Sequence, residues 1–421
     1  MGKSYVYPMF IIGTLFFVFG FLTWINGILI PYFQICLELS NFQSTWVAFS
    51  SYVAYFVMAI PSAWILKSTG YRKGMFLGLI VMALGTALFI PAAITRTYSL
   101  FLIGLFVTGT GLALLQTAAN PYVAIIGPIE SHAQRIGFMG LANKIAGLLS
   151  LAIFGSVFLF NADDIIKQVE VASIVEKEQI LDSYALKIVN PYIIVTLILL
   201  LLSVVIYFSK LPEVKDETEN QAEEGIESKS GILKYPYLLL GVFALFCAGA
   251  CEVIPIDGII LYSKSLGISI NESRYFAQYT LYAMIVGYIV SVLFIPKYLS
   301  QQKALLLSAL WGMFFTIVAY FSSGIISVGC VILMGFSASL FWGTIWGLSL
   351  KGLGKYTKLG SAMLLMSVVG GGIFPVIFGR LIDINVDYPQ TSILLLLPCY
   401  AFILFFALRG HKVIKWSGFN K

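Results

Sequence analysis

Three ionisable residues stand inside long apolar runs, where charged side chains are rare: Lys144, Glu252 and Asp257. A charged side chain at the centre of a bilayer costs about 3 kcal/mol on insertion scales, so such residues normally face the interior of a helix bundle and pair or bind something. Glu252 is expected near the middle of its run, and Asp257 lies about a turn and a half further along it. The chemistry indicated is ion pairing or cation binding within a membrane.

The two carboxylates outnumber the one ammonium group. If Lys144 pairs with one of them, the other must be protonated or hold a cation such as Na⁺, so a coupling site for H⁺ or Na⁺ is expected at Glu252 and Asp257. Pro255, between the two acids, predicts a kink or break with carbonyl groups free to coordinate an ion. The alternative is structural: Asp257 meets interfacial water, and Glu252 joins helices through Lys144.

Uncharged polar and aromatic residues within the runs form a second set. Several lie four residues apart and share a helical face, such as Gln116 with Asn120 and Trp342 with Trp346. Amides suit hydroxyl groups, and an aromatic face suits the apolar side of a sugar ring. Each amide alone is more often a contact between helices, and each Trp is more often packing. The predicted substrate-binding residues are Asn26, Gln116, Asn120, Asn143, Lys144, Gln278, Trp342 and Trp346.

Membrane-spanning helices must position these residues. Of the 421 residues, 59% are hydrophobic and 11% are charged, against about 25% charged in a soluble domain, which excludes a soluble enzyme. Apolar runs of at least about 18 residues are long enough to cross a bilayer. Twelve are predicted, at about 8–31, 43–66, 74–94, 99–127, 136–160, 190–209, 236–262, 274–296, 303–322, 325–350, 359–382 and 391–408.

The distribution of Lys and Arg predicts the orientation. With both termini in the cytoplasm, eighteen of these residues fall on the cytoplasmic side and seven on the outer side, which agrees with the positive-inside rule. The same asymmetry accounts for the net charge of +6 without a nucleic-acid partner.

One polar segment divides the chain. Residues 211–235 are rich in Glu and Lys, which is typical of a solvated linker. They separate an N-terminal half of six spans, 1–210, from a C-terminal half of six spans, 236–421. The segment 163–187 is a long outer loop, and the sequence indicates no role for it.

Other classes of function find little support. The five cysteines include no Cys-x-x-Cys pair and no neighbouring His, so neither a metal centre nor a disulfide framework is indicated. The two histidines fall outside the predicted spans, which argues against an intramembrane enzyme. No cofactor is expected beyond a coupling ion. A membrane sugar sensor would need a soluble signalling domain, for which the spans leave no room.

Short motifs run along the chain, at 26–33 (NGILIPYF), 41–43 (NFQ), 111–122 (GLALLQTAANPY), 127–131 (GPIES), 143–144 (NK), 252–253 (EV) and 358–361 (KLGS). Through them the chain resembles the fucose-type sugar:cation symporters of the major facilitator superfamily, particularly their bacterial glucose/galactose branch. The resemblance covers nearly the whole chain, and 111–122 is its most specific segment.

The resemblance implies an all-α membrane protein with twelve transmembrane helices in two six-helix halves and a substrate site near the midplane between them. It implies a monomer in a bacterial inner membrane that imports glucose or galactose by symport with H⁺ or Na⁺ through alternating access. The alternative is an uncoupled hexose facilitator, in which Lys144 and the acids form a permanent gating pair.

Two departures from the family matter. In the fucose symporters, an Asp and a Glu that carry proton coupling and sugar binding stand where this chain has Gly27 and Gln116. That mechanism does not transfer, so the cation site is expected to have moved to Glu252 and Asp257. Asn143 matches an Asn implicated in sugar contact in the fucose symporters, and the neighbouring Lys144 resembles the glucose/galactose branch.

Overall fold

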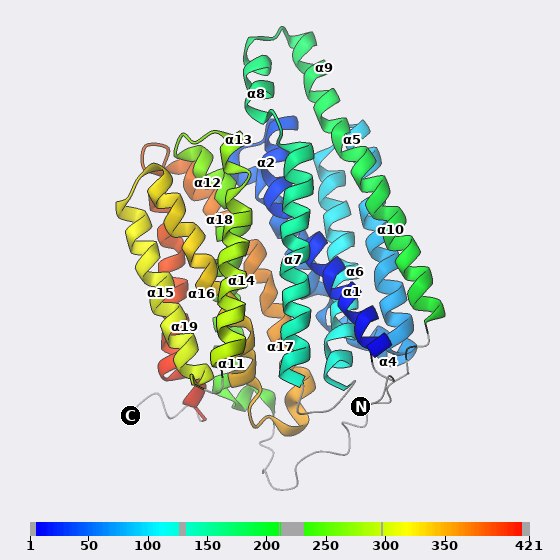
Figure 1. Cartoon of the computed structure of the whole chain (residues 1–421), viewed down its shortest axis with the longest axis vertical. Helices are drawn as coiled ribbons and strands as arrows, with labels where there is room; N and C mark the ends of the chain where they lie inside the picture. Colours follow the sequence, from blue (N-terminus) through cyan, green and yellow to red (C-terminus); the bar gives the residue numbers. More distant parts are fainter. Residues whose placement is uncertain (1–5, 126–131, 210, 212–230, 296–297, 415–421) are drawn as a thin grey trace.

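In the computed structural model, the chain forms a bundle of long helices (Figure 1). The structure describes residues 6–125, 132–209, 211, 231–295 and 298–414, apart from a few side chains within these ranges. In this part of the chain, eleven helical stretches are long and apolar enough to cross a membrane. Twelve spans are predicted, and the difference has one cause: the stretch Asn41–Ile94 contains two of them.

The two spans meet at Gly70, within α4 (Trp46–Ala87), where the backbone leaves the helix with φ 76° and ψ 171°. An unbroken helix of these 42 residues would be about 63 Å long, roughly twice the thickness of the hydrocarbon core. Instead the chain folds back, since a Cβ atom built at Gly74 would lie 2.1 Å from the side chain of Leu66. The prediction of two spans is therefore confirmed, and the structure shows a tight turn between them.

The other helices follow the predicted runs. In the N-terminal part they are α1 (Val6–Thr23), α2 (Asn26–Cys36), α3 (Asn41–Ser44), α5 (Phe89–Ile94), α6 (Tyr98–Ile125), α7 (His132–Phe158) and α10 (Val189–Phe208). In the C-terminal part they are α11 (Pro236–Asp257), α12 (Ile259–Ser265), α13 (Ile270–Ser273), α14 (Phe276–Phe294), α15 (Gln301–Phe321), α16 (Gly324–Leu350), α17 (Thr357–Met366), α18 (Gly370–Ile384) and α19 (Leu396–Leu408). Most of the predicted linker, 212–230, lies outside the described residues.

The first and seventh spans are each broken into two helices, α1 with α2 and α11 with α12. The seventh continues through Pro255 and breaks at Gly258, close to the predicted position. The carbonyl oxygen of Pro255 accepts a hydrogen bond from the Thr280 hydroxyl at 3.0 Å, so this carbonyl group is already satisfied by a neighbouring helix.

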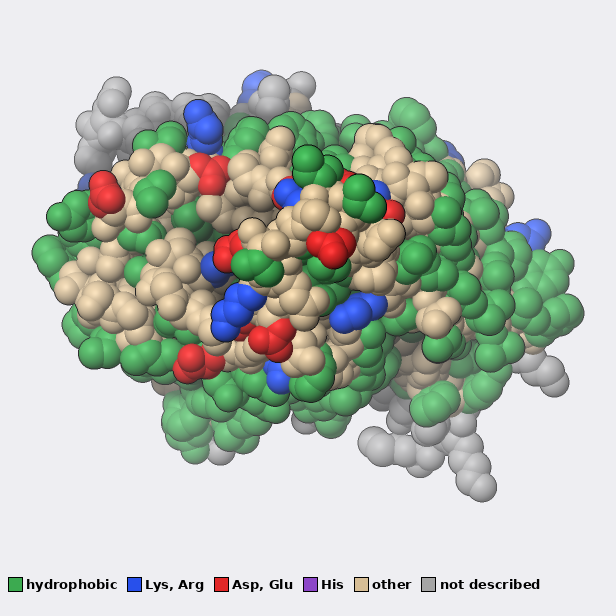
Figure 2. All heavy atoms as spheres, turned by 90° about the horizontal axis from the view of Figure 1, so that it is seen from above, with side chains coloured by type: hydrophobic (Ala, Val, Ile, Leu, Met, Phe, Trp, Pro, Cys, Tyr) green, Lys and Arg blue, Asp and Glu red, His purple; other side chains and the backbone are tan. Residues whose placement is uncertain are grey.

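The surface of the bundle is apolar around its sides. Phe208 is 77% exposed and Phe321 is 81% exposed, because lipid rather than water surrounds the spans. Seen from the end opposite the termini, charged side chains gather over the middle of the face and hydrophobic side chains surround them (Figure 2). This distribution is that of a multi-pass membrane protein.

The segment 163–187 forms most of a helical hairpin, α8 (Ala162–Val171) and α9 (Ile174–Ala185), which projects from the bundle (Figure 1). Ion pairs attach it to the first and third spans: Arg96 pairs with Glu178 and, at 3.0 Å, with Asp182, and Lys177 pairs with Glu38 at 2.5 Å. The end of the bundle that carries this hairpin is called the hairpin end below.

The N-terminal and C-terminal groups of spans pack against each other through α7 with α14, α4 with α18, and α2 with α11 and α12. A chain of hydrogen bonds closes this interface at the hairpin end. Lys264 Nζ donates to Gln34 Oε1 (3.1 Å), Gln34 Nε2 donates to Asn41 Oδ1 (2.7 Å), and Asn41 Nδ2 donates to Asp383 Oδ1 (2.7 Å). These four residues, Gln34, Asn41, Lys264 and Asp383, are called the hairpin-end seam.

The turn at Gly70 gives a test of the fold. Gly70→Ala is expected to destabilise the protein by about 1–3 kcal/mol, because glycine is the residue that tolerates this backbone conformation. The measurement is the thermal unfolding temperature of the purified protein in detergent. Gly329→Ala is the matched control, since that helical glycine has open space around it and Ala favours a helix. Equal unfolding temperatures for the two variants would contradict the assignment of strain to Gly70.

Candidate functional site

The structure pairs Lys144 of α7 with Glu252 of α11, across the interface between the two groups of spans. Lys144 Nζ donates to Glu252 Oε1 at 2.9 Å. Lys144 is 4% exposed and Glu252 is 6% exposed, so the pair is almost completely shielded from solvent. In such surroundings two opposite charges stay ionised only if each satisfies the other. The pair therefore links the two halves electrostatically near the middle of the bundle.

Aromatic side chains complete the coordination of this pair. Lys144 Nζ lies 3.9 Å from the centre of the Trp24 ring and 5.8 Å from that of Tyr288. Trp342 Nε1 donates a hydrogen bond to the second carboxylate oxygen of Glu252. A cation over a desolvated aromatic face gains about 2 kcal/mol, so the rings add to the stability of the buried ammonium group.

Asn143 joins the same cluster through Trp24, whose Nε1 donates to Asn143 Oδ1 at 3.1 Å. Trp24 lies at the break between α1 and α2, so the broken first span is held against α7. The cluster of Trp24, Asn143, Lys144, Glu252 and Trp342 is called the central cluster below. It combines amide, charged and aromatic groups from both halves, which is the set of groups that a polar, hydroxylated ligand requires.

Asp257 lies one and a half turns beyond Glu252 and is completely buried. In the described part of the chain, neither of its carboxyl oxygens has a hydrogen-bond partner. Its neighbour across the interface is Gly27 of α2, where a Cβ atom would lie 3.5 Å from Asp257 Oδ1 and 3.2 Å from the carbonyl oxygen of Ile256. The missing side chain at Gly27 therefore lets α2 pack directly against Asp257.

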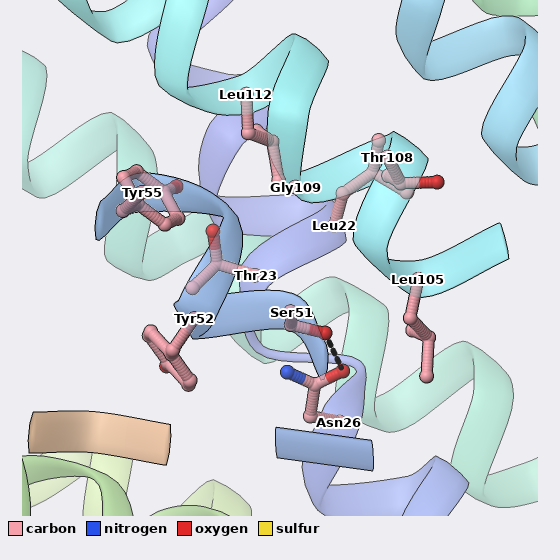
Figure 3. A pocket seen from close by; sticks show the side chains of 10 residues that line it. All are labelled: Leu22, Thr23, Asn26, Ser51, Tyr52, Tyr55, Leu105, Thr108, Gly109 and Leu112. Atoms are coloured by element: carbon pink, nitrogen blue, oxygen red, sulfur yellow. Dashed lines mark hydrogen bonds between the residues drawn. The ribbon is translucent and has the colours of Figure 1, made fainter. Parts of the chain in front are cut away.

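Two predicted amides lie in the N-terminal half beside a small cavity. Gln116 Nε2 donates to the Tyr55 hydroxyl at 3.0 Å. The Ser51 hydroxyl donates to Asn26 Oδ1 at 3.5 Å (Figure 3). The cavity, lined by Asn26, Ser51 and Tyr55 among others, has a volume of about 20 Å³, which is enough for one water molecule. A hexose does not fit, so a sugar site beside these amides would have to form as the helices part.

Besides Asn26 and Gln116, three more predicted binding residues are not part of the central cluster. Gln278 on α14 is half-buried and makes no hydrogen bond to a described residue, while Tyr282 on the same helix is 52% exposed. Trp346 packs on the core one turn along α16 from Trp342. Asn120 lies in α6, but its side chain is outside the described part of the structure.

Trp24 and Tyr288, which lie beside Lys144, are not among the residues predicted from the sequence. Trp24 stands two residues before the motif that begins at Asn26, and this position could have indicated that it lies near the binding residues. No sequence pattern singles out Tyr288, because its place beside Lys144 depends on the packing of α14 on α7.

Known proteins share this sequence and this fold. The sequence profile of the Major Facilitator Superfamily matches residues 12–375. A glucose/galactose transporter of Brucella abortus is 30% identical over 414 residues, which cover 97% of this chain and 95% of that protein. The L-fucose-proton symporter of Escherichia coli is 29% identical over 413 residues, which cover 96% of this chain and 93% of that protein.

The fold also matches solved structures. The transporter FucP in its outward conformation has a TM-score of 0.73 and 28% identity, and the match covers 96% of this chain and 99% of FucP. A bacterial homologue of the lysosomal transporter Spinster, in an inward-facing conformation, has a TM-score of 0.69 and 15% identity, with coverage of 99% and 100%. The second likeness concerns the fold alone.

The buried ion pair gives a second test. Lys144→Met or Glu252→Gln alone is expected to destabilise the protein by about 3–5 kcal/mol, because each leaves the partner buried without its counter-charge or strongest hydrogen-bond partner. The double variant should lose less than the sum of the two. Thermal unfolding in lipid nanodiscs measures these effects.

Lys177→Met is the control for this test, since it breaks the partly exposed pair with Glu38, for which about 0–1 kcal/mol is expected. If all three single variants unfold at the same temperature, the central pair does not stabilise the structure. If the effects of Lys144→Met and Glu252→Gln add, the two side chains are not coupled.

Proposed function

Because this chain belongs to the Major Facilitator Superfamily and, within it, to the fucose-type sugar symporters, we propose that it imports a neutral hexose, glucose or galactose, by cation symport through alternating access. It is a membrane-embedded sugar transporter and not an enzyme. The coupling ion is H⁺ or Na⁺, and no other cofactor takes part.

The central cluster is the observation that carries this proposal. It lies where the two halves meet, and its Lys144–Glu252 pair bridges them at 2.9 Å. Alternating access requires a site whose contacts to one half can be exchanged as the halves rock against each other. A buried pair of opposite charges meets this requirement, since sugar hydroxyls can replace the bonds that the two side chains now make to each other.

The sugar would be held by amides, by Lys144 and by aromatic faces. In the present structure Asn143 bonds to Trp24, Gln116 to Tyr55, and Asn26 to Ser51, so each amide has a partner when no sugar is bound. Trp342 would offer a ring face as Glu252 releases it. Asn120, Gln278 and Trp346 would join the sugar in other conformations of the cycle.

Coupling would depend on the two acids of α11, Glu252 and Asp257. They are the two carboxylates of that helix, and both are buried close to the interface. A carboxylate that gains or loses a cation changes the charge at this interface by one unit. The free energy of closing the halves then depends on the cation, which is the thermodynamic condition for symport.

The proposal also covers organisation and location. Both bacterial relatives are sugar transporters by name, and we place this protein in a bacterial inner membrane with the hairpin end outside and both termini in the cytoplasm. The halves 1–210 and 236–421 would rock as two bodies joined by the linker 211–235. The protein would work as a monomer in the lipid bilayer, since the sugar site lies within one chain.

Uptake into proteoliposomes tests the function. Radiolabelled glucose and galactose, each with a proton gradient, a Na⁺ gradient or neither, are expected to accumulate above equilibrium under one of the two gradients. An ionophore that collapses that gradient should abolish accumulation. Equilibration that ignores both gradients would instead mean an uncoupled facilitator, in which the Lys144–Glu252 pair serves only as a gate. No movement of either hexose would refute the assigned substrate.

Gln116→Ala tests the sugar site. The variant loses a hydrogen bond between the Gln116 amide and a sugar hydroxyl, worth about 1–3 kcal/mol. The apparent KM for the sugar should therefore rise by about 5-fold to 150-fold, measured from the concentration dependence of initial uptake. Gln168→Ala, on the exposed face of α8, is the matched control and should leave the KM unchanged. An unchanged KM in Gln116→Ala would remove this residue from the site.

A further inference from the structure

We propose that Asp257 is the proton-binding site of the transporter, and that its protonation is what allows the hairpin-end seam to close. This inference rests on the proposed function and narrows it. The coupling ion is then H⁺, and Asp257 rather than Glu252 carries it. The movement that the proton controls is the closing of the hairpin-end seam.

The environment of Asp257 favours the neutral acid over the ionised carboxylate. Its side chain has 0% exposure, and among the described residues neither oxygen has a hydrogen-bond partner. An ionised carboxylate in such a place has lost its water, and the backbone group that acts on it, the Gly27 N–H, lies outside hydrogen-bond geometry. Burying the ion is therefore far more costly than burying the neutral acid. The closed structure therefore requires the neutral acid at this position.

The charges around Asp257 already balance one another without it. The charged and titratable groups that act on Asp257 are Lys144 from α7, Glu252 on its own helix and Tyr52 from α4. Lys144 is already paired with Glu252 at 2.9 Å, and together these two carry no net charge. From α2 the neighbour is Gly27, and from α18 Phe378 packs on the adjoining Gly258. No described cation is left to balance an ionised Asp257.

The surroundings of Asp257 suit a proton better than a metal ion. A hard cation needs several oxygen ligands around it. The described residues contain no cluster of three or more His, Cys, Asp or Glu side chains that could hold a metal ion, so a cation at Asp257 would need carbonyl or hydroxyl oxygens as its other ligands. The nearby Pro255 carbonyl already accepts a hydrogen bond from Thr280. Because Gly27 has no side chain, α2 approaches Asp257 closely and leaves little room beside the carboxyl group for a hydrated cation. A proton needs only one carboxyl oxygen and no cage.

Asp257 is connected to the hairpin-end seam through two helices, α12 and α2. Asp257 is the last residue of α11, and the next helix, α12, carries Lys264 of the seam. Both helices pack against α2, which carries Gly27 beside Asp257 and Gln34 beside Lys264. When α2 separates from α11 and α12, Asp257 gains access to water from the hairpin end.

The cycle follows from this linkage. With the seam open, a carboxyl oxygen of Asp257 binds one proton from the outer water, and the charge of the side chain changes from −1 to 0. The neutral side chain can then be buried against Gly27, so α2 closes on α11 and α12. An ionised Asp257 would be an unpaired buried charge in the closed seam, so the seam stays open until the proton is bound. When the halves then part on the cytoplasmic side, the carboxyl group releases the proton to the inner water, its charge returns to −1, and the ionised side chain favours the return to the open seam.

The test measures the opening of the seam without any sugar. A reporter cysteine, Thr45→Cys, is placed in a background in which the five native cysteines, all of them buried, are replaced by Ala. Thr45 is buried against Gly379 of α18 at the same interface and is not one of the four seam residues. Right-side-out vesicles are labelled with a membrane-impermeant maleimide from about pH 5 to about pH 8, after correction for the reactivity of a freely exposed reporter, Asp164→Cys, in the same background. Opening of the seam is expected to rise with pH by up to about tenfold per unit, because one proton is released on opening.

Asp257→Asn, which is neutral at every pH, should give slow labelling that does not change with pH. Asp257→Glu should restore a pH-dependent profile. Asp387→Asn is the matched control, since that acid is exposed at the hairpin end, and it should behave like the parent protein. A parent profile without pH dependence, or an Asp257→Asn profile equal to that of the parent, would overturn the proposal.

Transport supplies an independent readout. Asp257→Asn is expected to exchange labelled for unlabelled sugar across the membrane but to lose accumulation driven by a pH gradient. If Asp257→Asn still accumulates sugar, Asp257 does not carry the coupling proton. If the parent protein accumulates no hexose under any gradient, the proposed function fails while the labelling result still stands or falls by itself.

The stability of the variant is controlled separately. Asp257→Asn is first checked for a single symmetric peak in size-exclusion chromatography in detergent. If it does not fold, Asp257→Glu decides the question, because a carboxyl group with one more methylene group should shift the midpoint of the labelling profile. An unchanged midpoint in that variant would overturn the proposal.

Discussion

The high cost of burying charge in a bilayer shapes the centre of this protein. Lys144 can lie there because Glu252 accepts its hydrogen bond at 2.9 Å and the Trp24 ring lies 3.9 Å away. Together with Lys144 itself, these partners come from three spans in two halves, so keeping the ammonium group satisfied also keeps the halves together. A ligand that opens this interface must offer polar groups in place of the contacts that it breaks.

The two broken spans make this interface adjustable. The first span breaks beside Trp24, and the seventh breaks at Gly258, directly after Asp257. The pieces nearer the hairpin end, α2 and α12, carry the Gln34–Lys264 bond of the hairpin-end seam. Of the central cluster, Glu252 lies on α11 before the break in the seventh span, and Trp24 lies at the break in the first span. Helices α2 and α12 can move while the central pair stays formed, because each break interrupts the helical hydrogen-bond ladder.

The neighbouring positions Gly27 and Asp257 explain how this chain departs from the fucose symporters it resembles. The resemblance implies an Asp in those proteins at the position of Gly27, which in this chain lies on α2. Here that position has no side chain, and the carboxyl group of Asp257 reaches the same region from α11, with Oδ1 3.5 Å from where a Cβ atom of residue 27 would be. In this chain a carboxyl group thus lies beside position 27, although the residue that supplies it is 230 positions further along the chain.

The sequence by itself determined the class of protein and its polar centre, because hydropathy and charge act locally. Runs of apolar residues define the spans, and Lys144, Glu252 and Asp257 stand out as charges within them. Only the tertiary structure decided which acid pairs with Lys144, because the two candidates are five residues apart on one helix and the partner is more than a hundred residues away. It also placed Trp24 and Tyr288 around Lys144 and left Asp257 without a partner, since those contacts depend on how the spans pack against one another.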